Sequence, residues 1–263
     1  MLICIKGAGD LASGIALRLH HAHFDIVMTD LPVPLAVRRT VAFSEAIRLG
    51  TAQVEDVKAE RAENVEEVTD CLNRGVIPVA ADSGAEIFKK LSPDVLVDAI
   101  MAKKNTGTSI DDAPLVIAVG PGFTAGRDCH AVIETKRGHT LGRVITEGSA
   151  IANTGVPGNI GGQTINRLIK ASNDGIFHPE RGIGDVVKEG ERVANVDGEP
   201  VYARTGGMIR GMLQDGVSVT KGMKAGDVDP RGDSVDYMTV SDKALAIGGG
   251  VLEAIMALGT FKG

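Results

Sequence analysis

The residues best suited to chemistry stand near the start of the chain, in a glycine turn between two apolar runs. Residues 2–5 are apolar, the turn follows as Gly7-Ala8-Gly9, and the next apolar run ends at Asp30. Gly7 allows a tight turn, and Gly9 lets the backbone approach a phosphate closely. Asp30 is spaced to accept hydrogen bonds from ribose hydroxyls. The pattern predicts the first half of a nucleotide-binding βαβ unit.

A helix must position this turn, because free N–H groups at a helix start face an anion. Apolar residues at helical spacing predict one directly after the turn: Leu11, Ala12, Ile15, Ala16 and Leu19. Two features count against an ordinary dinucleotide site. Asp10 brings negative charge to the phosphate position, unless it only caps the helix, and residues 31–34 (LPVP) turn the chain where a ribose would lie. A tight turn that binds nothing is the alternative.

Composition limits the classes of function. The 263 residues are 43% hydrophobic, but only six Phe, two Tyr and no Trp occur, which argues against base-stacking platforms. The net charge of −6 disfavours binding to nucleic acid. Three scattered cysteines without a CxxC motif favour a reducing compartment. No secretory signal or bilayer-spanning stretch is recognised, so we expect a cytoplasmic protein without membrane contact.

Apolar runs alternate with helical patterns as far as residue 119, which predicts a parallel sheet covered by helices. The expected strands are residues 76–80, 95–100 and 115–119, and the expected helices are 35–49, 65–74 and 85–91; residues 52–67 are read as a short strand and an exposed turn. Ligands bind beyond the carboxyl ends of such strands. Four segments fall at these ends, and we expect them to converge: GAGD (7–10), ADSG (81–84), DAIMAKK (98–104) and GPGFTAG (120–126).

Two short strands, residues 129–134 and 141–145, follow as an expected hairpin, joined by a cationic turn at residues 135–139 (TKRGH). Backbone N–H groups of GPGFTAG, together with Arg127, Arg137 and His139, can form an anion pocket. His130 and His139 lack a third ligand in pattern, so no metal site is predicted. Cys129 is read as a small buried residue, with a reactive thiol as the alternative.

A second glycine-rich loop, residues 156–164, is expected to open a helix at 164–171 or to act as a flexible connector. An internal repeat then relates residues 184–196 to 216–228, with glycines and valines matching 32 residues apart. Its short strands predict a two-fold β-sandwich of the biotinyl/lipoyl type. The hairpin between its halves lacks a lysine, so neither biotin nor lipoate is expected. Residues 241–256 predict a helix, capped by Ser241, that docks on the main body.

The predicted fold class is therefore α/β: a Rossmann-like, mostly parallel sheet, plus a small all-β biotinyl/lipoyl-like sandwich and a C-terminal helix. Four parts are expected: a Rossmann-like nucleotide-binding domain (1–126), a hairpin and connecting region (127–180), the β module (181–235), and the helix that packs on the main body (236–263).

Several segments together resemble the YqeB family, proteins of the selenium-dependent molybdenum hydroxylase system. They are GAGDLASGIALRL, PLAVRRTVAFSEA, GPGFTAG with HAVIET and RGHTLGRVI, and SDKALAIGGGVLEAI, in order over nearly the whole chain. The GAG turn is also similar, more distantly, to the Rossmann domain of XdhC/CoxI proteins, which help insert molybdenum cofactor into hydroxylases; Asp10 departs from that pattern. The resemblance implies an accessory or maturation role and carries over no catalytic residue.

The first hypothesis is thus an accessory protein that binds a nucleotide or pterin-type phosphate ligand in a cleft at the sheet's carboxyl edge. The predicted ligand-binding residues are Gly7, Ala8, Gly9, Asp10, Leu11, Asp30, Gly120, Pro121, Gly122, Phe123, Thr124, Arg137 and His139. Candidate cofactors are NAD(P), another nucleotide, or a molybdopterin-type cofactor. Expected partners are this phosphate-bearing molecule, a molybdenum hydroxylase apoenzyme and further copies of the chain.

Two alternatives remain open, and with them the question of whether the protein is an enzyme. One is an NAD(P)-dependent oxidoreductase, in which His130 or Lys103 would donate a proton. The other is a non-catalytic interaction protein, in which the β module is a docking surface and the glycine turns bind nothing.

Overall fold

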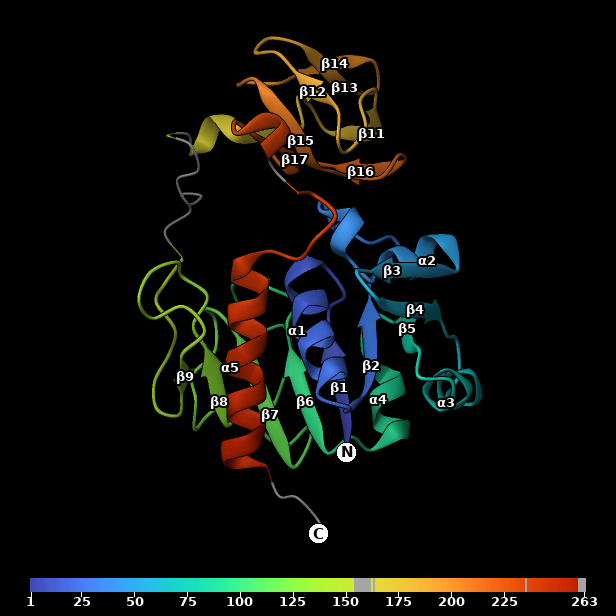
Figure 1. Ribbon diagram of the computed structural model, residues 1–263, viewed down its shortest axis with the longest axis vertical. Helices are drawn as coiled ribbons and strands as arrows, with labels where there is room; N and C mark the ends of the chain where they lie inside the picture. Colours follow the sequence, from blue (N-terminus) through green and yellow to red (C-terminus); the bar gives the residue numbers. More distant parts are fainter. Residues whose placement is uncertain (154–161, 163, 235, 260–263) are drawn as a thin grey trace. The chain divides into compact units, whose positions relative to one another are not determined.

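The computed structural model describes residues 1–153, 162, 164–234 and 236–259. The chain forms two compact units. The first unit comprises Met1–Pro34, Val41–Asn153 and Val240–Gly263, and the second comprises Leu35–Thr40 and Thr154–Thr239. Figure 1 shows both units.

The first unit is built on a nine-stranded sheet with the order β3-β4-β5-β2-β1-β6-β7-β8-β9. Its strands are β1 (Leu2–Lys6), β2 (Asp25–Asp30), β3 (Thr51–Val54), β4 (Val57–Arg61), β5 (Ile77–Ala81), β6 (Val95–Asp98), β7 (Leu115–Val119), β8 (Ala131–Ile133) and β9 (Val144–Ile145). The strands from β4 to β8 in this order pair in parallel, whereas β3 and β9 close the two edges by antiparallel pairing.

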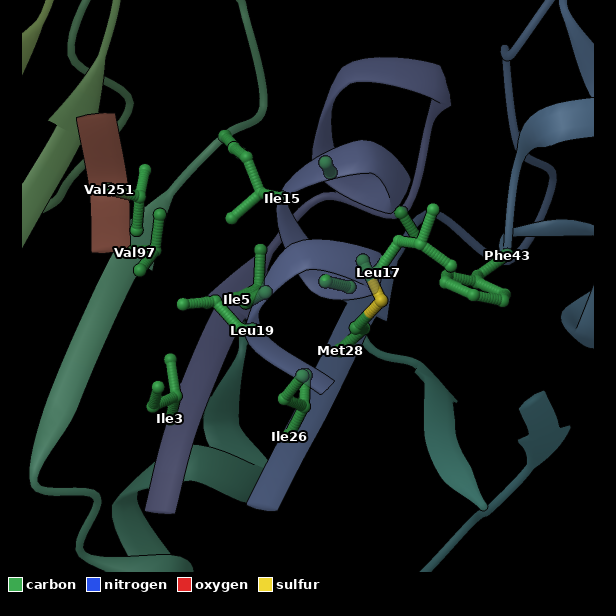
Figure 2. Close-up of a cluster of buried hydrophobic side chains, with 14 of the residues drawn as sticks. Ile3, Ile5, Ile15, Leu17, Leu19, Ile26, Met28, Phe43, Val97 and Val251 are labelled. Atoms are coloured by element: carbon green, nitrogen blue, oxygen red, sulfur yellow. The ribbon is translucent and has the colours of Figure 1, made fainter. Parts of the chain in front are cut away.

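Helices cover both faces of this sheet. They are α1 (Asp10–His21), α2 (Glu45–Leu49), α3 (Val65–Asn73), α4 (Glu86–Leu91) and α5 (Asp242–Leu258). The short 3-10 turn η1 (Arg39–Val41) begins in the second unit and ends at the first residue of the segment that leads to α2. The helices α1 and α5 lie side by side (Figure 1) and share one apolar core with alternate side chains of β1. Figure 2 shows Ile3, Ile5 and Val97 from the sheet gathered with Ile15 and Leu19 from α1. The intervening Cys4 points to the opposite core, under α3 and α4.

Most predicted elements of the first unit are confirmed, including α1, the hairpin of β8 and β9, and α5 with Ser241 as its N-cap. The predicted helix over residues 35–49 is wrong. Val37 O accepts the Met212 N–H at 2.7 Å within the second unit. In the first unit, Phe43 N–H donates to Ser13 Oγ at 2.8 Å. These bonds use backbone groups that a continuous helix would need, so only Glu45–Leu49 is α-helical.

The second unit contains two four-stranded antiparallel sheets, ordered β10-β17-β15-β12 and β14-β13-β11-β16. Its elements are η2 (Ile165–Arg167), β10 (Leu168–Lys170), β11 (Gly175–Pro179), β12 (Val186–Val187), β13 (Arg192–Val196), β14 (Glu199–Tyr202), β15 (Gly207–Met212), β16 (Val217–Val219), β17 (Lys224–Asp229) and η3 (Gly232–Ser234). The predicted helix at 164–171 is wrong, because β10 pairs with β17 there. The glycine-rich loop before it lies, except for residues 162 and 164, outside the described residues.

The predicted fold class, a Rossmann-like sheet with a biotinyl/lipoyl-like sandwich, is wrong. The main sheet is mixed, because hairpins close both edges; the charged residues read as an exposed turn form the β3–β4 hairpin. The repeat does fall on strands, but each copy places one strand in each sheet of the second unit, and no clear lipoyl-type sandwich emerges from the described strands. The protein therefore combines a large, mainly parallel sheet, two small antiparallel sheets and a C-terminal helix.

Candidate ligand site at the carboxyl edge of the sheet

Gly7 is required by the backbone of the β1–α1 turn. Its φ of +96° lies in the region that favours glycine. Its N–H donates to Thr29 O at 2.8 Å, and an added Cβ would lie 2.9 Å from Ala99 O. The tight turn predicted from the sequence is confirmed, and it brings the end of β1 against the end of β6.

Gly9 differs from Gly7 in that no described residue requires a glycine there. Its φ is −70° and its ψ −177°, which any residue adopts, and an added Cβ would meet no atom of the described residues within 4 Å. Gly9 is the N-cap of α1 and provides no side-chain cap. The first intrahelical bond runs from Ser13 N–H to Gly9 O at 2.8 Å. The N–H groups of the three residues between them therefore point out of the helix without an intrahelical acceptor.

Asp30 holds the glycine loop. Its two oxygens accept the N–H groups of Ala8 at 2.8 Å and Leu31 at 2.7 Å. Burial raises the pKa of this carboxyl, although both hydrogen bonds oppose the change. The ribose role stays a prediction, and the geometry gives Asp30 a different task, that of fixing the loop. With the Gly7 and Ala8 N–H groups already bonded, a phosphate is left with the N–H groups from Gly9 onward.

Three of the four segments expected to converge do adjoin. Gly7 abuts Ala99 in DAIMAKK, and an added Cβ at Gly122 would lie 2.6 Å from Lys104 Cα. Between them, Met101 and Lys103 have φ of +62° and +64°, which costs non-glycine residues backbone strain. The fourth segment, ADSG, has a local role: Asp82 accepts the N–H of Ile87 at 2.8 Å, in the first turn of α4.

The segment GPGFTAG divides into two parts. An added Cβ at Gly120 would lie 3.0 Å from Thr135 Oγ1, so the first part adjoins the cationic turn, with Pro121 between the two glycines. Phe123 is buried in the core, and Thr124 N–H donates to Asp128 Oδ2 at 2.8 Å. The side chains of this second part therefore serve packing and the local turn.

Glu134, which the sequence reading missed, fixes the cationic turn. Its buried carboxylate accepts N–H groups from Thr135 and Lys136, both at 2.7 Å, and from Ile151 at 2.8 Å. Arg137 makes a two-pronged ion pair with Asp242 on α5, at 2.6 and 2.9 Å. His139 is exposed. The turn is thus tied to the start of α5.

The close approach of α5 brings a further cation, Lys243, to this edge. Burial and the charge of Arg137 lower the pKa of Lys243, whereas Asp10, Glu134 and Asp242 oppose the change. The charged groups that act on Lys243 therefore come from α1, from the residue after β8 and from the cationic turn. No short sequence motif could signal this position, because it depends on how two distant helices pack.

A second group missed from the sequence lies beside Gly7. Lys6 Nζ donates to Thr108 Oγ1 at 2.9 Å, and Thr108 Oγ1 donates to the buried Asp98 at 2.7 Å. Burial raises the pKa of Asp98. Lys6 also pairs with Asp112 at 3.3 Å. This chain of contacts secures the loop after β6 and leaves Lys6 engaged.

The remaining candidates have structural surroundings. Burial raises the pKa of Cys129 to about 11, which disfavours a reactive thiolate. His130 Nδ1 accepts the Val116 N–H at 2.9 Å. Arg127 pairs with its neighbour Asp128 at 3.0 Å. Among the described residues, no group of three or more His, Cys, Asp or Glu is arranged to hold a metal ion. No helix formed by the described residues has the length and apolar character needed to cross a membrane.

The likeness to solved structures is weak. An aspartoacylase family protein from Mesorhizobium loti is 13% identical, with a TM-score of 0.29 over 86% of this chain and 84% of that one. The ectoine utilization protein EutE (DoeB) from Ruegeria pomeroyi is 14% identical, with a TM-score of 0.27 over 86% and 85%. Likenesses with TM-scores this low carry no argument about fold or function.

Sequence comparison is more informative. No protein-family model matches the chain. Its similarity to the uncharacterized protein YqeB of Escherichia coli (strain K12) is 52% identity over 257 residues, which is 98% of this chain. The chain spans about half of that relative, 48% of its length. The identity supports the YqeB family for this chain, over the half of YqeB that it covers.

Proposed function

We propose that the first unit binds a phosphate-bearing small molecule, a nucleotide or a pterin-type phosphate ligand, at the carboxyl edge of its sheet. The observation that carries this proposal is the contrast between Gly7 and Gly9. Gly7 is explained by its φ and its contact with Ala99, but Gly9 has neither constraint. A ligand that approaches the backbone at the start of α1 would explain a glycine there.

The neighbouring groups favour an anion. The first N–H groups of α1 carry the positive end of its dipole. Lys243 adds a cation, and the exposed Lys103 and Lys104 lie in the loop that contacts Gly122. These cations oppose the carboxylate of Asp10, one of the two features of the sequence that count against an ordinary dinucleotide site.

The hydrogen bonds of the Asp30 carboxylate favour a ligand that places no ribose against this carboxylate. Both of its oxygens accept backbone N–H groups, so a ribose would have to share them. A pterin-type phosphate makes no such demand. NAD(P) is retained as a candidate cofactor to be tested directly.

At the level of the whole protein, we propose an accessory or maturation role in a selenium-dependent molybdenum hydroxylase system, with a hydroxylase apoenzyme as partner. The support is the family resemblance of the sequence segments; the 52% identity to YqeB, an uncharacterized protein, bears on the family and not on the role. The test is whether adding this protein raises the molybdenum content of a hydroxylase apoenzyme supplied with free cofactor. An unchanged metal content would contradict the role.

Ligand binding is tested by thermal unfolding with NAD⁺, NADP⁺, FAD, ATP, CTP and molybdopterin. A ligand at about a hundredfold excess over its Kd stabilises the folded state by about 2.7 kcal/mol. We expect at least one ligand to raise the melting temperature of the wild type but not of Gly9→Val. Gly249→Val is the matched control, because Gly249 is also without positive φ and open to an added Cβ. Failure of every ligand to stabilise the wild type would contradict the proposal.

A further inference from the structure

We infer that Lys243 is the specificity-determining residue of this site: it binds the anionic group of the ligand beside the first turn of α1. The site would then select phosphorylated ligands over the corresponding uncharged nucleoside or pterin. This inference rests on the proposed function and assigns its charge selection to one side chain.

The packing of α1 against α5 sets the position of Lys243. An added Cβ at Gly14 would lie 2.5 Å from Ala244 Cβ, and one at Gly248 would lie 2.9 Å from Gly14 O. Arg18 Nη2 donates to Leu245 O at 3.3 Å. The same added Cβ at Gly248 would lie 3.1 Å from Arg18 Cβ. Gly14 and Arg18, four residues apart on α1, thus meet Ala244 and Gly248, four residues apart on α5, so the two helices run parallel and start at the same edge of the sheet (Figure 1). Lys243, just before Ala244, falls level with the turn preceding Gly14, where Asp10 lies.

The surroundings of Lys243 suit a ligand contact. The side chain is half-buried, and within the described part of the chain no hydrogen bond or ion pair holds its ammonium. Nearby charged groups are Asp10 on α1, Glu134 at the end of β8, Arg137 in the cationic turn and Asp242 on α5. The Asp242 carboxylate binds Arg137, and the Glu134 carboxylate binds backbone N–H groups. Glu134, Arg137 and Asp242 are thus engaged with other groups, and Lys243 stays available to an anion.

The charge of Lys243 also explains how Asp10 is tolerated. A carboxylate at the first helical position would repel a phosphate at close range. A cation from a neighbouring helix offsets that repulsion without occupying the N–H groups of α1. An uncharged ligand gains nothing from this arrangement, which is the physical basis of the expected selectivity.

The experiment is calorimetric titration of the wild type with inorganic pyrophosphate, ATP and adenosine, and with the other ligands of the thermal panel. We expect Lys243→Met to weaken the phosphate-bearing ligands by about tenfold or more, and Lys243→Arg to retain most of the affinity. Lys90→Met is the control: it removes an exposed cation from α4 and should leave affinity unchanged. Unaltered melting temperatures would show that each variant is folded.

A pH profile separates charge recognition from a structural role. Because the pKa of Lys243 is lowered, affinity should fall at a lower pH than for an ordinary lysine, and Lys243→Arg should abolish that fall. If the wild type binds a phosphate ligand and Lys243→Met binds it equally well, this inference is overturned while the proposed function stands. If the wild type binds none of the ligands, both are overturned.

Discussion

Buried carboxylates at the carboxyl edge of the first unit accept hydrogen bonds mainly from backbone N–H groups, whereas those of the second unit pair with arginines. Asp30 and Glu134 each hold a loop in this way. In the second unit, Arg167 pairs with Asp227 at 2.8 Å, and Arg210 and Arg231 pair with Asp229 at 3.0 and 2.8 Å. The first arrangement shapes loops and leaves Lys243 available to a ligand. In the second arrangement the arginines are bound in ion pairs within the unit, as is typical of a structural network.

The largest expected effect is on this network. Asp227→Asn removes the negative partner of Arg167, and both side chains are nearly inaccessible to solvent. Breaking a buried ion pair leaves an uncompensated charge and costs about 3 kcal/mol. Tyrosine fluorescence during urea unfolding measures it selectively, because both tyrosines of the protein, Tyr202 and Tyr237, belong to the second unit. An unchanged midpoint would show that the network contributes little.

The next effect is a difference in response to acid. Burial raises the pKa of Asp229, but the guanidinium groups of Arg231 and Arg210 outweigh it and hold the pKa at about 2. Its contribution, about 2 kcal/mol, is present above the unfolded pKa near 3.8 and is lost as pH falls toward 2. Asp229→Asn should flatten this acid dependence of the tyrosine-monitored stability. If the variant keeps the wild-type slope, Asp229 does not carry the effect.

The sign is opposite for Asp30, whose pKa is raised by burial. A raised carboxyl pKa means that the folded state binds the proton more tightly. Stability from this group is therefore present at low pH and lost as pH rises through the folded pKa. Asp30→Asn should remove that loss in circular-dichroism melts, while Asp25→Asn, at an exposed position of β2, should not. An equal effect of the two would contradict the assignment.

A smaller effect separates the two glycines of the loop. Gly7→Ala places a side chain at positive φ against Ala99 O and should destabilise the first unit by about 1–2 kcal/mol. Gly9→Ala should cost less, about 0.5–1 kcal/mol, because only the preference for glycine over alanine at the N-cap is lost and its surroundings are open. Circular-dichroism melts of both variants test this difference. Equal destabilisation would mean that Gly9 has a structural role and would weaken the case for a ligand.

Local patterns were enough to predict most of the first unit. The helical spacing after Gly9, the apolar runs and the Ser241 cap each depend on neighbours in sequence, and the structure confirms them. The helix predicted for residues 35–49 is wrong because hydrogen bonds of Val37 and Phe43 to residues far away in the sequence override the helical composition. The β3–β4 hairpin was missed because its outward-facing residues are charged. The predicted fold class is wrong because the pairing of edge strands, and the sheet to which each strand belongs, depend on residues far apart in the sequence.

The candidate site was predicted in its backbone parts but not in its side chains. The glycine turn and the adjoining loops follow from spacing. The roles of Glu134 and Lys243 depend on hydrogen bonds and helix packing over long sequence separations, which no motif encodes. Asp30 shows the reverse case, since its spacing suggested a ribose but its oxygens bind the loop itself.

The most direct test of the central claim is a ¹⁵N NMR titration of the wild type with ATP and molybdopterin. If the start of α1 binds phosphate, the amide signals of Asp10, Leu11 and Ala12 should shift most with the ligand that binds. The amide of Ala8 should respond less, because it already donates to Asp30. If the signals of α1 stay in place with both ligands, or if the largest shifts fall in the second unit, the phosphate site proposed here is wrong.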